Sequence, residues 1–255
     1  MAKRIEDLKI IDHKRLTDDI FVIELLCKST LPDLLPGQFV QVRVDGSSDT
    51  FLRRPISVHD VNKAENTFSL LIQIKGSGTA ALSRLDVGDE INLVYPLGNS
   101  FSMPSEGEKV LLAGGGCGVA PLLFLGNYLR EAGIIPDILL GFRNSKRVIE
   151  YDKYTELGPV YLTTEDGSMG EKGYITGHTV MSEKKFDRIY CCGPEPMMKA
   201  VASYSVKRGI ACEVSLENLM ACGIGVCLCC VADTVRGHVC TCTEGPVFNV
   251  KELKW

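Results

Sequence analysis

The spacing of apolar runs changes once along this 255-residue chain, and this change constrains the fold more than any other feature. Up to about residue 100, short strand-like runs follow one another, separated by turn residues such as Pro36-Gly37 and Gly88-Asp89. Consecutive strands of this kind predict an antiparallel β-barrel. The six predicted strands are residues 7–16, 20–27, 38–44, 53–61, 67–75 and 90–98, with a short helix at 78–85.

From Lys109 the chain alternates strands with helices, which predicts a parallel, doubly wound α/β sheet. The predicted strands are residues 109–113, 136–142, 159–165, 186–192 and 211–217, and the predicted helices are 119–133, 149–157, 175–182 and 195–209. Pro104, Ser105 and Gly107 interrupt both patterns. We therefore expect a barrel over residues 1–100, an α/β domain over 101–217 and a small cysteine-rich subdomain over 218–255.

Composition excludes several classes of protein. Hydrophobic residues make up 45% and charged residues 24%, as in ordinary globular proteins. The first ten residues are charged and lack the apolar stretch of a secretory signal, and no run approaches the ~20 apolar residues of a membrane span. A net charge of −4 removes the electrostatic case for nucleic acid. We expect a cytoplasmic protein that binds neither nucleic acid nor membrane.

Two turns of the α/β domain predict a nucleotide site. Gly114, Gly115, Gly116 and Gly118 follow an apolar strand and open a helix, where backbone N–H groups can approach a pyrophosphate. Cys192-Gly193-Pro194 follows another strand, at the same carboxyl edge where ligands bind in such sheets. The glycine run is not a complete G-x-G-x-x-G fingerprint, and the next strand ends in Arg143 and Asn144 rather than an acid. A tight turn without a ligand is the structural alternative.

Two motifs of the barrel predict a second diphosphate site. Arg54-Pro55-Ile56-Ser57 lies on a strand, where an arginine beside a hydroxyl group can hold phosphate through charge-assisted hydrogen bonds. Gly76-Ser77-Gly78-Thr79 opens the short helix and offers N–H groups to the same group. The alternative interpretation is a solvated arginine and an ordinary helix cap.

The most specific motif is at the C-terminal end, where six of the eleven cysteines fall within residues 222–255. Cys222, Cys227, Cys230 and Cys242 have the C-x4-C-x2-C…C order of plant-type [2Fe–2S] proteins. A four-cysteine zinc site needs the same number of thiolates, but usually pairs them as C-x2-4-C twice. Cys229 and Cys240 are additional thiols in the same segment, so another choice of ligands stays open.

The remaining reactive residues suggest no further chemistry. His13, His59, His178 and His238 share no metal-type spacing and are interpreted as surface or loop residues. Five other cysteines lie mostly on apolar runs and are predicted to be buried: Cys27, Cys117, Cys191, Cys192 and Cys212. Cys117 is the exception to watch, because a helix N-terminus lowers the pKa of a thiol.

In this order, the barrel, the R-P-I-S and G-S-G-T motifs, the glycine turn and the C-G-P motif resemble the ferredoxin–NADP reductase superfamily over residues 1 to about 217. With the cluster motif, the whole chain resembles the electron-transfer subunits of NAD-linked dihydroorotate dehydrogenases. The resemblance implies an FAD-binding barrel, an NAD-binding α/β domain and a [2Fe–2S] subdomain. It assigns FAD binding to Arg54, Pro55, Ile56, Ser57, Leu71, Ile72, Gln73, Gly78 and Thr79, and the cluster to Cys222, Cys227, Cys230 and Cys242.

The resemblance also implies a partner. This partner is an FMN-containing catalytic subunit that oxidises dihydroorotate in pyrimidine biosynthesis, in a heterotetramer with two copies of each subunit. Electrons then pass from its flavin through the cluster and FAD to NAD⁺.

The small subunit of an NADH-dependent ferredoxin–NADP reductase has a similar cluster loop, but in that family an aspartate stands where this chain has Cys222. A zinc-stapled nucleotide-binding module without redox chemistry is the third hypothesis. The preference for NAD over NADP comes from the resemblance alone, since Arg143 could also meet a 2′-phosphate.

Overall fold

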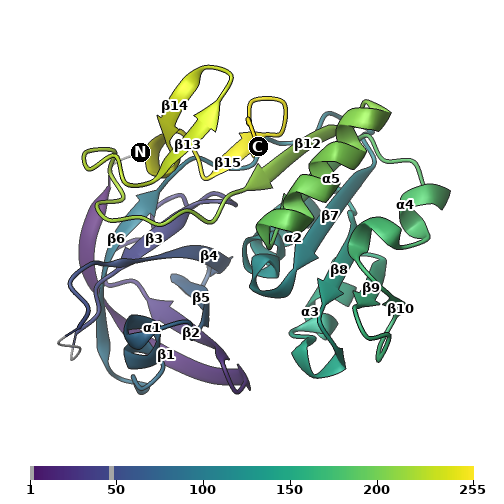
Figure 1. Ribbon diagram of the computed structural model, residues 1–255. Helices are drawn as coiled ribbons and strands as arrows, with labels where there is room; N and C mark the ends of the chain where they lie inside the picture. Colours follow the sequence, from purple (N-terminus) through teal and green to yellow (C-terminus); the bar gives the residue numbers. More distant parts are fainter. Residues whose placement is uncertain (1–2, 46–48) are drawn as a thin grey trace.

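The structure of the protein is a computed structural model, which describes residues 3–45 and 49–255. Figure 1 shows a barrel formed by the N-terminal part of the chain, with a sheet flanked by helices beside it. The C-terminal segment, in yellow, lies across the barrel and the near edge of the sheet. The predicted fold class is confirmed, whereas the exact division at residues 100 and 217 stays a prediction.

The barrel is closed, antiparallel and six-stranded, in the order β1-β2-β5-β4-β3-β6. All six strands lie where the sequence predicts them: β1 (Arg4–Thr17), β2 (Ile20–Leu26), β3 (Phe39–Val42), β4 (Arg54–Asn62), β5 (Thr67–Gln73) and β6 (Glu90–Leu97). Helix α1 (Ser77–Leu82) separates the last two. Alternate residues of each strand fill the barrel with apolar side chains, among them Ile23, Val40 and Ile72.

The second sheet has the order β10-β9-β8-β7-β11-β12-β15. Its parallel strands are β7 (Val110–Gly115), β8 (Asp137–Phe142), β9 (Val160–Thr164), β10 (Glu171–Lys172), β11 (Arg188–Cys192) and β12 (Ala211–Ser215). The connecting helices are α2 (Ala120–Glu131), α3 (Tyr151–Thr155), α4 (Val180–Glu183) and α5 (Glu195–Arg208). The predicted helix at 175–182 is interrupted, because His178 has an extended backbone and its Nδ1 accepts a hydrogen bond from Val180 N (3.0 Å).

The C-terminal segment is held by both larger parts. Its hairpin, β13 (Val231–Thr234) and β14 (Gly237–Cys240), is followed by α6 (Thr241–Glu244). Strand β15 (Val247–Asn249) then joins the parallel sheet antiparallel to β12. On the barrel side, Phe39 and Leu97 pack against Met220, Cys230 and Cys242. The segment therefore shares a hydrophobic cluster with the barrel and a strand pairing with the sheet.

Candidate functional site

The barrel motifs come together at the start of α1. The guanidinium of Arg54 lies against Gly78 so closely that a Cβ at Gly78 would be 2.9 Å from Arg54 Nε. Arg54 Nη1 donates to the carbonyl of Leu52 at 2.8 Å. The hydroxyl of Thr79 accepts from the N–H groups of Lys75 (2.9 Å) and Gly76 (3.3 Å), so this side chain caps the helix. Arg54 and the Gly78 backbone thus form a compact donor group suited to a diphosphate.

The other predicted FAD residues lie on the two strands beside this group. Pro55, Ile56 and Ser57 pair with β3, while Ile72 points into the barrel core. Leu71, its neighbour, instead packs into the apolar cluster shared with the second sheet. Gln73 donates to Asp19 (3.1 Å), whose carboxylate is also bound by Arg147 of the α/β domain. Leu71 and Gln73 therefore lie at the seam between the two domains.

The structure brings the glycine turn and the C-G-P motif into direct contact. Strands β7 and β11 are neighbours, with Gly114 opposite Cys192. A Cβ at Gly118 would overlap the backbone of Gly193, so only glycine permits this close approach of the two turns. A Cβ at Gly115 would meet the end of the flexible Met197 side chain.

Part of this edge remains open to a ligand. Gly116 has φ +55°, and no atom of the described residues lies within 4 Å of a Cβ built there. Two buried oxygens at the adjacent strand ends, Asn144 Oδ1 and Thr163 Oγ1, have no hydrogen-bond partner in the described part of the chain. An accessible glycine backbone at the carboxyl edge of the sheet fits a nucleotide, and so do unpaired polar atoms after β8 and on β9.

Cys117, in the same turn, does not have the low pKa that a helix N-terminus suggests. Burial raises the pKa of its thiol to about 12, and the charges of Lys75, Glu217 and Asp19 act on it as well. Those charges come from the barrel and from the end of β12, so Cys117 marks the point where the barrel and the glycine turn meet. The raised pKa agrees with the expectation of a buried apolar thiol at Cys117, and the effect of the helix N-terminus does not outweigh burial.

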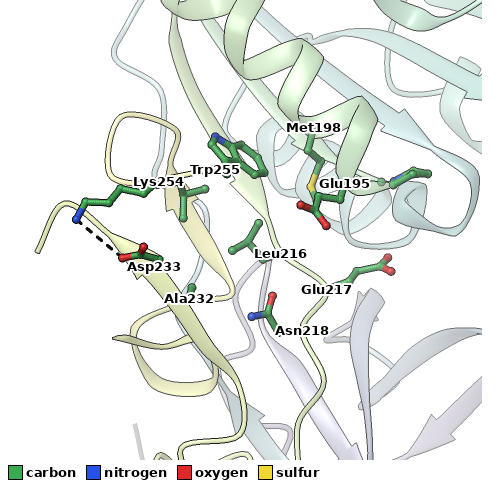
Figure 2. Close-up of a pocket in the computed structure, with 12 residues that line it drawn as sticks. Glu195, Met198, Leu216, Glu217, Asn218, Ala232, Asp233, Lys254 and Trp255 are labelled. Atoms are coloured by element: carbon green, nitrogen blue, oxygen red, sulfur yellow. Dashed lines mark ion pairs between the residues drawn. The ribbon is translucent and has the colours of Figure 1, made fainter. Parts of the chain in front are cut away.

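A pocket lies next to the C-G-P motif. It has a volume of about 330 Å³ and is lined by Gly193 and Pro194, by residues 216–218 after β12, and by the C-terminal residues Leu253–Trp255. Figure 2 shows these groups facing one another, with Lys254 paired to Asp233 (3.9 Å). The sequence did not predict this cavity, because its walls come from three separate parts of the chain.

The four predicted cluster ligands come together as two pairs. Cys227 N donates to Cys222 Sγ at 3.5 Å, and Cys242 N donates to Cys230 Sγ at 3.4 Å. In the described part of the chain, no three or more Cys, His, Asp or Glu side chains lie together as ligands of one metal ion do. A [2Fe–2S] cluster needs two thiolates on each iron, so paired thiols fit it better than a single zinc ion.

The loop backbone already donates to these sulfurs. Gly225 N lies 3.2 Å from Cys242 Sγ, Ile224 N lies 3.4 Å from Cys222 Sγ, and Cys242 N lies 3.4 Å from Cys230 Sγ. Although burial raises the pKa of Cys222, hydrogen bonds from the backbone amides of Ile224, Cys227 and Val226 and from the Cys227 thiol lower it to about 6. Gly223 (φ 71°) and Gly225 (φ 85°) allow the necessary curl. This donor set fits a thiolate-ligated cluster.

The additional thiols differ in their surroundings. Cys229 is exposed, and its sulfur points away from the pairs to the carbonyl of Leu219 (3.7 Å). Cys240 lies at the end of β14 and contacts Cys230. Cys27, Cys191, Cys192 and Cys212 are buried, as predicted.

Two histidines are buried, whereas the sequence analysis interprets them as surface or loop residues. His178 is buried, and His59 is fully buried on β4. His59 Nε2 lies 2.7 Å from Glu150 Oε2, and its Nδ1 lies 2.9 Å from the carbonyl oxygen of Ala120, at the start of α2. His59 thus connects the FAD-motif strand with the helix that follows the glycine turn. Its position two residues after Ser57 was the only signal in the sequence.

Family profiles match both ends of the chain. Residues 7–101 match an oxidoreductase FAD-binding domain, and residues 217–254 match the iron–sulfur cluster binding domain of dihydroorotate dehydrogenase B. The first range covers the barrel from residue 7 of β1 to the end of β6, and the second contains all four predicted cluster ligands. Among the described residues, no helix is long and apolar enough to cross a membrane.

Among solved structures, an NADH-dependent reduced ferredoxin–NADP oxidoreductase is 31% identical, with a TM-score of 0.88 over 97% of this chain and 90% of that one. A ferredoxin reductase of carbazole 1,9a-dioxygenase shares the fold at 20% identity, with a TM-score of 0.71 over 82% of this chain and 67% of that one.

Curated relatives match nearly end to end. The dihydroorotate dehydrogenase B (NAD(+)) electron transfer subunit of Caldanaerobacter subterraneus subsp. tengcongensis is 37% identical over 96% of both chains. The subunit of the same name from Shouchella clausii is 37% identical over 99% of both chains. With this identity over the full length, and with the barrel, nucleotide edge and paired thiols in place, the chain belongs to the family of dihydroorotate dehydrogenase B electron transfer subunits.

Proposed function

We propose that this chain carries electrons from the FMN of a dihydroorotate-oxidising partner, through one [2Fe–2S] cluster and FAD, to NAD⁺. The partner would be the catalytic subunit of the complex, and we propose two copies of each subunit in the assembly. All eleven cysteines are free, which suits work in the reducing cytoplasm.

The observation that carries the proposal is the position of the two thiol pairs. Cys230 and Cys242 are buried against Phe39 and Leu97 on the outer wall of the barrel, whereas Cys227 is exposed. The pair Cys230 and Cys242 thus packs against the FAD-binding barrel, whereas Cys227 of the other pair faces the molecular surface. This arrangement suits a relay that takes electrons from outside and passes them inward.

The surface around the exposed pair supports a protein partner. Leu219 is 87% exposed, Val226 76% and Leu228 66%, and all three lie on the loop that bears the ligands. Apolar side chains gathered around a redox centre favour a protein interface over bulk solvent. We therefore assign this loop to the contact with the catalytic subunit.

The chain's own residues would bind and orient the two nucleotides. Arg54 and the Gly78 backbone would hold the FAD diphosphate, and the turn from Gly114 to Gly118 would hold the dinucleotide pyrophosphate with Cys192, Gly193 and Pro194 beside it. When bound, FAD joins one-electron to hydride chemistry, because it accepts electrons singly or in pairs whereas nicotinamide takes a hydride. The seam that joins Gln73, Asp19 and Arg147 would keep the two sites at a fixed separation. No side chain is required as an acid or base.

The similarity to the ferredoxin–NADP oxidoreductase supports a second candidate function, in which the chain is a subunit of an enzyme of that kind. Cys222 favours the dihydroorotate system, because the other family is expected to have an aspartate at this position. Replacing Cys222 by Asp in the complex is an informative comparison, since it converts one ligand set into the other.

The test is to purify the chain alone and together with its catalytic partner. We expect stoichiometric flavin, two irons and two sulfides per chain, and NADH oxidation by the isolated chain with artificial acceptors. Dihydroorotate-dependent reduction of NAD⁺ should require both subunits. Zinc in place of iron would support the structural zinc module, and dihydroorotate turnover by the isolated chain would contradict the assignment of the chemistry to the partner.

A further inference from the structure

Gln41 is a fully buried polar side chain of the barrel. It lies on β3 and has no exposed surface. In the described part of the chain, neither its amide nitrogen nor its amide oxygen has a hydrogen-bond partner. Buried amides are normally satisfied, because an unpaired polar group loses its hydration without compensation. An exception of this kind calls for a ligand.

Strand β3 directs this side chain to the cluster loop. Val40 and Val42 point into the barrel core, whereas Phe39 packs outward against Cys230 and Cys242. Side chains alternate along a strand, so Gln41 shares the outer face with Phe39. A Cβ at Gly223 would lie 2.7 Å from Gln41 Cγ and 3.0 Å from Nε2, which places the amide against the residue that follows Cys222.

The backbone of Gln41 also links this point to the FAD motif. Gln41 is paired with Pro55 on β4 and with Val94 on β6. Its carbonyl accepts a hydrogen bond from Arg53 Nη1 at 3.2 Å. The backbone of Gln41 is therefore fixed beside the strand that carries Arg54, and its side chain lies against the cluster loop.

We propose that Gln41 is a positioning residue for electron transfer, whose amide N–H group donates a hydrogen bond to a sulfur of the bound cluster. The inference rests on the proposed function, since it requires the cluster at Cys222, Cys227, Cys230 and Cys242. A donor facing sulfur stabilises the additional negative charge of the reduced cluster and so raises its reduction potential. Gln41 thereby sets how readily electrons leave the cluster for FAD.

The first experiment uses the wild-type chain. Glutamine occurs at only three positions, 38, 41 and 73, so labelling glutamine amides with ¹⁵N introduces three probes. The Gln38 amide donates to Gly98 O (3.3 Å) and the Gln73 amide to Asp19 (3.1 Å), which leaves Gln41 as the one facing the loop. Pulsed EPR of the reduced cluster should show ¹⁵N coupling that disappears in Gln41→Met. No coupling in wild-type protein with full iron would overturn the proposal.

The second experiment measures the potential. Gln41→Met removes the donor at similar length, and Gln41→Glu replaces it with a negative charge. At the wild-type midpoint potential, we expect the ratio of reduced to oxidised cluster to fall about tenfold in Gln41→Met, which equals about 59 mV for a one-electron couple. The ratio should fall further in Gln41→Glu.

Gln38→Met is the matched control, because Gln38 is buried but bonded within the protein to Leu35 N and Gly98 O. It should leave the cluster potential unchanged. An unchanged potential in both Gln41 variants, or a shift of the flavin potential alone, would overturn the inference. Wild-type chain without iron would instead remove the proposed function, so the two failures can be distinguished.

Discussion

At the scale of single residues, the direction of each sulfur matters more than its place in the motif. Spacing predicted Cys222, Cys227, Cys230 and Cys242, and the structure brings these four into two pairs. Spacing could not decide about Cys229, which adjoins a ligand in the sequence. The structure shows its thiol turned to Leu219 O, and the preceding residue, Leu228, has a left-handed backbone (φ 55°).

We predict that serine at any of the four paired cysteines abolishes the cluster, because one iron would lack a thiolate. Cys229→Ser and Cys240→Ser should retain it, with Cys240 the stricter test because it contacts Cys230. The measurements are iron content and the EPR signal of the reduced chain. Flavin content should stay constant across all six variants. Loss of iron in Cys229→Ser with retention in Cys230→Ser would show that the ligand assignment is wrong.

We predict that Arg54→Ala weakens FAD binding. Each charge-assisted hydrogen bond to the diphosphate is worth roughly 1.5–3 kcal/mol, so the loss of one raises the dissociation constant by about 10- to 150-fold. Flavin retained after gel filtration, and titration of the apoprotein with FAD, measure this effect. Arg43→Ala is the control, since Arg43 is exposed and paired with Asp45. Equal FAD affinity in both variants would exclude Arg54 from the site.

At the scale of elements, the sequence predicted most of what is periodic and missed what depends on distant pairing. All six barrel strands followed from alternating apolar residues, and the five main parallel strands from their apolar runs. Strand β15 has three residues and exists because β12 offers it an edge, which no local pattern reveals. His59 was misjudged for a similar reason: its partners, Glu150 and Ala120, belong to the other domain.

The His59–Glu150 pair joins β4 to the start of α3, and it should make stability depend on pH. Burial alone raises the pKa of Glu150, but the hydrogen bonds and charges of His59 and Lys153 outweigh it and lower this pKa to about 2. The folded state therefore favours the carboxylate. Its contribution, up to about 3 kcal/mol, is complete above pH ~4.5 and fades as the pH falls towards 2.

We predict that Glu150→Gln lowers the free energy of unfolding by about 2–3 kcal/mol at pH 7, and that the difference from wild type shrinks below pH ~4.5. Denaturant titrations between pH 7 and pH 3 measure both values. Glu156→Gln, an exposed position directly after the same helix, should change stability by less than about 0.5 kcal/mol. A difference independent of pH would mean that the charge of Glu150 is not what stabilises the contact.

At the scale of the whole molecule, the C-terminal segment that carries the cluster motif (residues 218–255, the cluster segment) connects the barrel with the sheet. Asn99, just beyond the end of β6, is central to it. Its amide nitrogen donates to the carbonyls of Glu244 (2.8 Å) and Val247 (2.9 Å), and its amide oxygen accepts from Val247 N (3.0 Å). These bonds fix the return from Cys242 to β15. Motif spacing predicts four cysteines as cluster ligands, but it does not predict that a barrel residue holds their loop.

We predict that Asn99→Ala releases the cluster segment while the barrel stays folded. Loss of three hydrogen bonds should cost roughly 2–4 kcal/mol locally, at about 1 kcal/mol each. In wild type, cluster absorbance and far-UV circular dichroism should change together on heating, because the segment is bound to both larger parts. In Asn99→Ala, cluster absorbance should be lost at a lower temperature, and electron transfer to the partner should fail while NADH still reduces FAD.

Asn66→Gly is the matched control, since Asn66 also makes three side-chain hydrogen bonds, to Cys27, Ser29 and Leu31, but all within the barrel. This control should lower both transitions equally. Coincident transitions in Asn99→Ala would instead show that the cluster segment unfolds only together with the rest of the chain.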